Sequence, residues 1–185
     1  MQALIDAPEH HHEYEIVGFV TDQPSAQALT RAASAGIPGA VIALEDFVDR
    51  NEWNHALCDA ISTYGPDVVV SAGFMRVIAE PTLSTFDSRI INTHPALLPA
   101  FPGAHAVRDA LAAGATSTGC TVHVVDSGVD TGPIITTQEV EISANDTESS
   151  LHERIKIIER SLLVQTIISI ARNGLSVAGR KVYTP

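Results

Sequence analysis

The pair Asn92 and His94 stands at the end of a short apolar segment, in the order Asn92-Thr93-His94-Pro95. Side chains of an extended strand alternate between its two faces, so Asn92 and His94 would project to the same side if the strand continues to Pro95. An amide donor beside a titratable imidazole suits the binding of an oxyanion. Asn and Pro are also turn formers, so an ordinary turn after a strand stays the alternative.

Two carboxylates, Asp126 and Asp130, lie in a short segment that contains two glycines and joins two strand-like stretches. Each could organise the turn through nearby backbone groups, which is the commoner role of a lone Asp in such a place. A carboxylate near a histidine raises the pKa of the imidazole and can exchange protons with it. Both roles stay open for these residues. His123, inside a strand-like stretch, is expected to be a hydrogen-bonded core residue rather than a catalyst.

Arg76 follows a strongly apolar segment and is flanked by Met75, Val77 and Ile78. In a chain with a net charge of −11, a single Arg at this place is a candidate for binding an anionic ligand, although a solvated surface charge fits equally well. The three apolar neighbours could form a wall for that ligand or pack in the core.

Glu159 interrupts a stripe of apolar residues at helical spacing, with Leu151 and Ile155 before it and Leu162 after it. A carboxylate in such a stripe either reaches water at its edge or faces a pocket and binds a polar ligand. The histidine run at residues 10–12 is expected to be a solvated loop rather than a metal site.

Strand-like and helix-like segments alternate along the chain, which predicts βαβ units. The expected fold is α/β, with a Rossmann-like open, mainly parallel sheet, helices on both faces, and a hairpin and a long helix in the C-terminal part. Asn145 or Asp146 is expected to cap that long helix. Strands are predicted at residues 14–21, 40–44, 67–71, 89–92, 120–125 and 133–142, with short pieces near 177 and 182, and helices at 25–35, 46–64, 105–113 and 147–172.

Length and composition limit the number of domains and the classes of partner that the chain can have. The 185 residues fit one domain, residues 1–185, at roughly 100 to 200 residues per domain. The 11 Lys and Arg against 22 Asp and Glu would repel phosphate backbones and anionic membranes, so neither nucleic acid nor membrane is expected as a partner. Cys58 and Cys120 show no metal-binding spacing, and a cytoplasmic location is expected.

Several segments together resemble the folate-dependent formyltransferases. The most specific of them is the block of residues 91–99, with the pattern Asn-x-His-Pro-x-Leu-Leu-Pro. The resemblance covers nearly the whole chain and extends to residues 72–76, 101–103 and 126–134. It implies transfer of a formyl group from 10-formyltetrahydrofolate to the amine of glycinamide ribonucleotide in purine biosynthesis, with no metal required.

The resemblance also implies the roles of individual residues. Asn92, His94 and Asp130 match the catalytic positions of the family, and Lys156 and Glu159 match positions that hold the ribonucleotide. The residues expected around the folate are Arg50, Met75, Arg76, Val77, Ile78, Asn92, Asp126, Ser127, Gly128, Val129 and Asp130. The expected partners are these two small molecules, with a homodimer as an alternative to a monomer.

Two other functions stay open: a formyltetrahydrofolate deformylase, which uses water as the acceptor, and a folate-binding protein without catalysis. The second follows from the start of the sequence. Residues 1–7 resemble the helix after the family's first strand, and no glycine precedes Gly18. We therefore expect a domain that lacks the family's first strand and its phosphate-binding loop.

Overall fold

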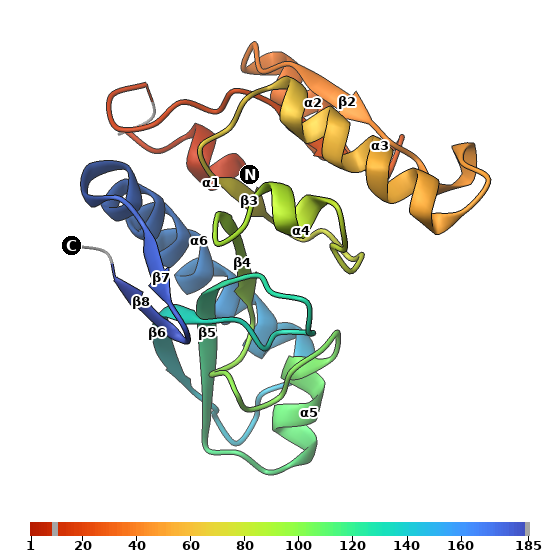
Figure 1. The fold of residues 1–185 in the computed structure, drawn as a ribbon. Helices are drawn as coiled ribbons and strands as arrows, with labels where there is room; N and C mark the ends of the chain where they lie inside the picture. The colour runs from red at the N-terminus through yellow and green to blue at the C-terminus, as the bar shows by residue number, and fades with distance from the viewer. Residues whose placement is uncertain (9–10, 184–185) are drawn as a thin grey trace.

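The computed structural model describes residues 1–8 and 11–183 (Figure 1). The histidine run predicted as a solvated loop lies partly outside the described residues. The helices are α1 (Gln2–Ile5), α2 (Gln27–Ser34), α3 (Arg50–Thr63), α4 (Thr82–Thr85), α5 (Ala106–Ala112) and α6 (Glu148–Asn173), with a 3₁₀ turn at Leu44–Asp46. The strands are β1 (Phe19–Thr21), β2 (Gly39–Val41), β3 (Val69–Ser71), β4 (Ile90–His94), β5 (Ser117–Val124), β6 (Ile134–Glu141), β7 (Ser176–Ala178) and β8 (Lys181–Tyr183).

The strands form three separate sheets among the described residues, in the orders β1-β2, β3-β4-β5-β6 and β7-β8. Pairs β1-β2 and β3-β4 are parallel, whereas β4-β5, β5-β6 and β7-β8 are antiparallel. The α/β class is confirmed, but the mainly parallel sheet is wrong: the sheets are mixed. For β5 and β6 the reason is the short connection between them, since a parallel pair needs a crossover of a dozen residues or more.

Strand β4, an inner strand of the four-stranded sheet, is covered on both of its faces. Ile91 packs against α6 through Leu163 and Ile167. Its neighbour Ile90 points to the other face and joins the cluster of Cys58 and Phe86. Helices therefore lie on both sides of the strand that carries the Asn-x-His pattern, and its backbone is held firmly.

Helix α6 is capped one residue later than predicted. The hydroxyl of Thr147 accepts from the Ser150 N–H at 3.1 Å, and the Ser150 side chain accepts from the Thr147 N–H at 2.9 Å. This reciprocal capping box fixes the helix start. Asp146, one of the two predicted caps, instead accepts from Ser143 N–H and pairs with Arg154.

A slot separates β1 from β3. The Phe19 N–H donates to Pro38 O, and Val69 N–H donates to Arg89 O, so these residues face β2 and β4 respectively. Alternate residues of a parallel strand direct their backbone groups to opposite sides, and Val20 and Val70 therefore turn theirs toward the slot.

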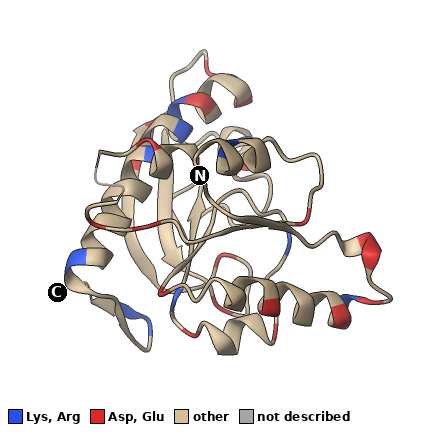
Figure 2. Ribbon diagram, turned by 90° about the horizontal axis from the view of Figure 1, so that it is seen from above, with Lys and Arg blue, Asp and Glu red and all other residues tan. Residues whose placement is uncertain are grey.

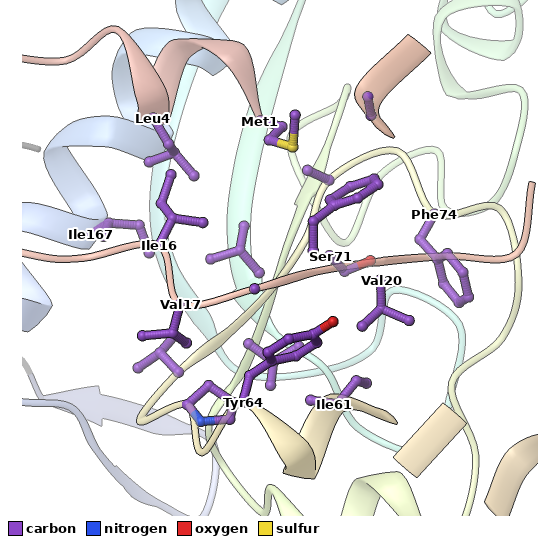
Figure 3. Close-up of a pocket in the computed structure, with 18 of the residues that line it drawn as sticks. Met1, Leu4, Ile16, Val17, Val20, Ile61, Tyr64, Ser71, Phe74 and Ile167 are labelled. Atoms are coloured by element: carbon purple, nitrogen blue, oxygen red, sulfur yellow. The ribbon is translucent and has the colours of Figure 1, made fainter. Parts of the chain in front are cut away.

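The slot is an apolar cavity of about 710 Å³, and within residues 1–8 and 11–183 no strand occupies it (Figure 3). Side chains from α1, α3 and α6 line it, among them Leu4, Ile61 and Ile167. Tyr64 also points into it and lies against Gly18, where a Cβ would come within 2.3 Å of the Tyr64 ring. Only glycine fits at position 18.

Candidate active site

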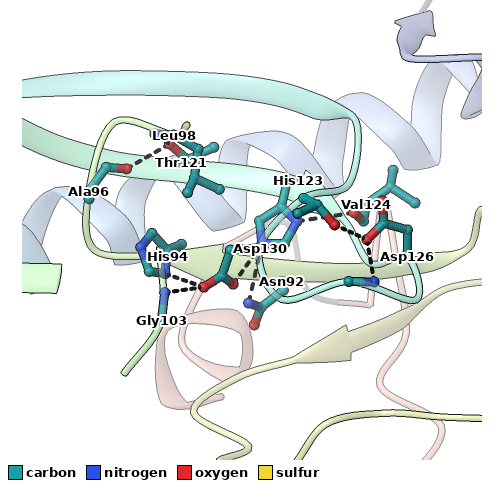
Figure 4. Close-up of polar contacts among 12 residues, drawn as sticks. Asn92, His94, Ala96, Leu98, Gly103, Thr121, His123, Val124, Asp126 and Asp130 are labelled. Carbon is teal, nitrogen blue, oxygen red and sulfur yellow. Dashed lines mark hydrogen bonds and ion pairs between the residues drawn. The ribbon is translucent and has the colours of Figure 1, made fainter. Parts of the chain in front are cut away.

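Strand β4 carries Asn92 and His94 at its carboxyl end, on the same face (Figure 4). The strand does continue to His94, and both residues pair in register with β5, Asn92 with His123 and His94 with Thr121. The ordinary turn at Asn92 is therefore excluded. His94 is buried, with 4% of its surface exposed, so its ring is held by protein groups rather than by solvent.

Asp130 reaches this pair from the loop between β5 and β6. Its Oδ2 lies 3.3 Å from His94 Nδ1 and accepts from the Gly103 N–H at 2.8 Å. Its Oδ1 lies 3.6 Å from His123 Nε2. Asp130 has a φ of 54°, which costs energy for a residue with a side chain, and these contacts hold it there. The structure thus brings Asn92, His94 and Asp130 together (Figure 4).

Asp126 takes the other role that the sequence left open. Its Oδ1 accepts from the Gly128 N–H at 3.0 Å and from the Thr131 hydroxyl at 2.6 Å. This is an Asx-turn, which shapes the loop and leaves Asp130 to face the histidines. Arg180, in the hairpin β7-β8, donates to Thr131 O at 2.6 Å and secures the same loop from outside.

The two histidines differ in the groups that surround them. His94 Nε2 lies 2.7 Å from Phe101 O, and its Nδ1 faces Asp130. A carbonyl and a carboxylate only accept, so the doubly protonated ring of His94 satisfies both partners.

His123 has the opposite arrangement. Its Nδ1 lies 3.0 Å from Val124 O and must donate, which leaves Nε2 to accept from the Asn92 amide at 3.3 Å. Burial lowers the pKa of His123 and outweighs the hydrogen bond to Val124 O and the nearby Asp130, which both raise it. We therefore assign His123 as a neutral ring that orients Asn92.

His123 is the site residue that sequence reasoning missed. It is buried and hydrogen-bonded, as expected for a core residue, yet it contacts Asn92 and lies near Asp130. Its position opposite Asn92 comes from the register of β4 and β5. No signal in the sequence gives that register.

The segment after β3 presents two of its expected ligand residues to solvent and buries a third. Met75 and Val77 are exposed, whereas Ile78 packs in the core with Phe86 and Ile90. Val125, at the base of the other expected folate loop, packs against the same core cluster. The two loops therefore meet at their bases.

Arg50 and Arg76, the two arginines expected near the folate, both hold the segment that follows β3. Arg50 donates to Val77 O at 2.6 Å and lies over the Trp53 ring at 4.2 Å. Arg76 forms an ion pair with Asp22 at 2.7 Å. Ser127, Gly128 and Val129 are exposed on the facing loop. The slot cavity reaches Phe74 and Ile78 but none of residues 126–130, so it is not the folate pocket expected between the loops.

Glu159 and Lys156 lie one helical turn apart on α6 and have different partners. Glu159 Oε1 accepts from the Thr93 hydroxyl at 3.0 Å, which places this carboxylate beside the strand of Asn92 and His94. Lys156 pairs with Glu153 at 2.8 Å on the helix surface. Of the two residues, the structure brings only Glu159 to β4.

The described residues offer little support for a metal site, a reactive cysteine, a basic surface patch or a membrane-spanning helix. Across residues 1–8 and 11–183, no three His, Cys, Asp or Glu side chains form a group that could hold a metal ion. Both cysteines are free and buried, and burial raises the pKa of Cys120 to about 11. Lys and Arg lie on several separate elements rather than in one patch (Figure 2). None of the described helices is long and apolar enough to cross a bilayer.

The sequence model of the formyl transferase family matches residues 1–167, and the chain belongs to this family. Among its relatives is the phosphoribosylglycinamide formyltransferase of Mycobacterium tuberculosis, 46% identical over 180 residues that cover 97% of this chain and 83% of that protein. The human trifunctional purine biosynthetic protein adenosine-3 is 36% identical over 172 residues, 92% of this chain and 17% of that much longer protein.

Solved structures agree with this assignment. Glycinamide ribonucleotide transformylase 1 from Symbiobacterium toebii superimposes with a TM-score of 0.93 at 37% identity, over 98% of this chain and 86% of that one. The phosphoribosylglycinamide formyltransferase of Coxiella burnetii gives a TM-score of 0.92 at 33% identity with the same coverage of 98% and 86%.

Proposed function

We propose that the chain transfers a formyl group from 10-formyltetrahydrofolate to the amine of glycinamide ribonucleotide in purine biosynthesis. The observation that carries this proposal is the convergence of Asn92, His94 and Asp130 in a chain whose relatives are named phosphoribosylglycinamide formyltransferases. Residues 1–185 act as one formyltransferase domain. The two free, buried cysteines fit a reducing cytoplasm.

In the proposed reaction, the hydrogen-bond partners of Asn92 and His94 orient these side chains toward the oxyanion that forms. The substrate amine attacks the formyl carbon, a new C–N bond forms, and negative charge develops on the formyl oxygen. One N–H of the Asn92 amide is held by His123, and the other, without a partner among the described residues, donates to this oxyanion. His94, between Asp130 and Phe101 O, places positive charge beside it.

Proton transfer completes the reaction. The attacking amine loses a proton as the bond to the folate nitrogen breaks, and that nitrogen must gain one. Asp130 carries this proton, directly or through a water molecule. Its left-handed backbone and its Gly103 hydrogen bond keep the carboxylate at the catalytic strand during the transfer.

Binding of the two substrates is divided between two sides of β4. The folate lies against Met75, Arg76, Val77 and Ile78 and against the loop Asp126, Ser127, Gly128, Val129 and Asp130, with Arg50 behind the first segment. Glu159 and Lys156 hold the ribonucleotide. Support for this division comes from β4 itself, which carries Asn92 toward one side and Thr93 toward Glu159 on the other.

The test is an assay of the formylated ribonucleotide together with formate release. Wild-type chain should form the first product, whereas release of formate with or without the amine acceptor would favour the deformylase alternative. Asn92→Ala should lower turnover on the order of 10²-fold, as expected for the loss of one oxyanion donor. Asn51→Ala, an exposed Asn on α3, is the matched control and should keep wild-type turnover. Unchanged turnover of Asn92→Ala would contradict the proposed mechanism.

A further inference from the structure

The segment of residues 73–78 is held by contacts at four of its residues, while the side chains of Met75 and Val77 stay exposed. Phe74 stacks on Trp53 with the ring centroids 6.2 Å apart and the planes 6° from parallel. Arg50, also on α3, donates to Val77 O, and Ile78 is buried in the core. Three of the anchors therefore come from α3 and the core beside it.

The fourth anchor comes from a different sheet. Arg76 Nε lies 2.7 Å from Oδ2 of Asp22, the residue that directly follows β1. The two residues are 54 positions apart in the sequence. Since β1 and β3 exchange no strand hydrogen bonds, this ion pair is a polar link across the slot between their carboxyl ends.

Asp22 is well placed to fix the direction of Arg76. It is buried, with 8% of its surface exposed, whereas the Arg76 side chain is one-third exposed. Gln23 adds a second donor to the same oxygen at 3.2 Å. Burial by itself would raise the pKa of Asp22, but the hydrogen bonds from Arg76 and Gln23 outweigh it and lower the pKa. A buried carboxylate is costly without its partner, so the pair favours one orientation of Arg76.

We infer that Asp22 is a positioning residue for the folate site: through Arg76 it holds Met75 and Val77 in the orientation that binds the cosubstrate. Arg76 then serves the folate by fixing the segment and not as a ligand of a folate carboxylate. A preformed binding surface binds its ligand more tightly because the entropy cost of ordering the segment is not part of the binding free energy. This inference rests on the proposed function, since it concerns the folate wall of that same site.

The experiment is a double-mutant cycle read out by folate affinity. Calorimetric titration with 5-formyltetrahydrofolate, a stable isomer of the cosubstrate, is carried out on wild type, Asp22→Asn, Arg76→Gln and the double variant. Each single variant should weaken binding about tenfold, and the double variant should be no weaker than either, because both changes remove one link. In turnover assays the KM for the folate should rise in the same ratio, with kcat close to the wild-type value.

A matched control is the ion pair of Arg172 with Glu13, which has a similar length of 2.6 Å and lies away from this segment. Arg172→Gln and Glu13→Gln should keep wild-type folate affinity. Thermal unfolding of every variant separates loss of folding from loss of affinity. If Asp22→Asn fails to fold, Arg76→Gln makes the same test, because the Arg76 side chain is one-third exposed.

Two results would overturn the inference. One is wild-type affinity of Asp22→Asn. The other is a strong effect of Arg76→Gln that persists unchanged in the Asp22→Asn background, since Arg76 would then bind the ligand itself. Failure of the wild-type chain to bind 5-formyltetrahydrofolate at all is a separate outcome, and it would remove the proposed function and this inference together.

Discussion

His94 and His123 lie on neighbouring strands, yet their hydrogen-bond partners favour opposite charge states. Two acceptors, Phe101 O and Asp130, face the ring of His94. His123 instead donates to Val124 O and accepts from Asn92. A charged His123 would have no acceptor at Asn92 Nδ2, so the neutral ring is the form that orients the Asn92 amide.

The neutral state of His123 predicts a pH dependence of stability. Because burial lowers the pKa of His123, the unfolded chain binds a proton near pH ~6.5, where the folded chain does not yet do so. The unfolded state then holds more protons, and the free energy of unfolding falls as the pH drops below ~6.5.

Denaturant titrations at pH values from ~7.5 to ~5.5 should show this fall in wild type and a smaller one in His123→Gln. His55→Gln, on an exposed position of α3, is the control and should keep the wild-type slope. Equal slopes for wild type and His123→Gln would mean that His123 does not titrate on unfolding.

The sequence indicated which residues to propose for catalysis, but it did not give their contacts. Asn92 and His94 are two residues apart on one strand, so alternation alone places them together. Asp126 and Asp130 share one short loop, and residue type does not show which forms the Asx-turn and which faces His94. That distinction depends on contacts with Gly103 and His123, which are distant in the sequence.

At the scale of elements, β4 presents different polar side chains on its two faces because its side chains alternate. Asn92 and His94 face the loop of Asp130, while Thr93 points to the opposite side and donates to Glu159 on α6. Within the described residues, Thr93 is the hydrogen-bond partner that the structure gives to Glu159. One strand thus carries the proposed catalytic side chains on one face and, on the other, the contact to the proposed ribonucleotide-binding residue Glu159.

Thr93→Val should weaken binding of the ribonucleotide and leave the chemical step nearly intact. Valine has a similar shape but no hydroxyl, so Glu159 loses its donor and its fixed orientation. We expect the KM for the ribonucleotide to rise about fivefold, which corresponds to the loss of about 1 kcal/mol, with little change in kcat. Thr93→Ser keeps the hydroxyl and should restore the wild-type KM. A fall in kcat alone would place Thr93 in the chemical step instead.

Element types were largely predictable, and element partners were not. Most helices and strands lie where the periodicity predicted them, but β1, β2 and β3 are shorter than expected and α3 begins four residues later. The antiparallel direction of β5 relative to β4 depends on how the chain through α5 returns to the sheet, which periodicity does not encode. The cap of α6 moved to Thr147 because Ser150 offers the reciprocal bond, while Asp146 binds Arg154.

For the whole molecule, the slot between β1 and β3 leaves two strand edges that no strand of residues 1–8 and 11–183 pairs with. Unpaired edges beside an apolar cavity are templates for another extended segment. We expect concentration-dependent self-association in sedimentation velocity experiments. Val20→Lys, a charge at one of these edges, should reduce it, and Val48→Lys, on a fully exposed loop position, should not. Equal association of all three chains would show that the edges are not involved.

The same slot leads us to expect that the molecule opens in two cooperative units. Within the described residues, the unit of β1, β2 and α2 shares no strand ladder with the other strands, whereas β4 and β5 are paired on both of their sides. Opening of the smaller unit therefore breaks few backbone hydrogen bonds and should cost less free energy than global unfolding. In native-state hydrogen exchange, the amides of Thr21 and Ile42, whose N–H donates to Thr21 O, should therefore exchange through a low-energy local opening, while those of Val122 and Val124 should exchange only through global unfolding. Asp22 belongs to the smaller unit and Arg76 to the larger one, so each such opening would also release the segment that carries Met75 and Val77. Folate binding should therefore slow hydrogen exchange in β1, a strand that the ligand does not touch.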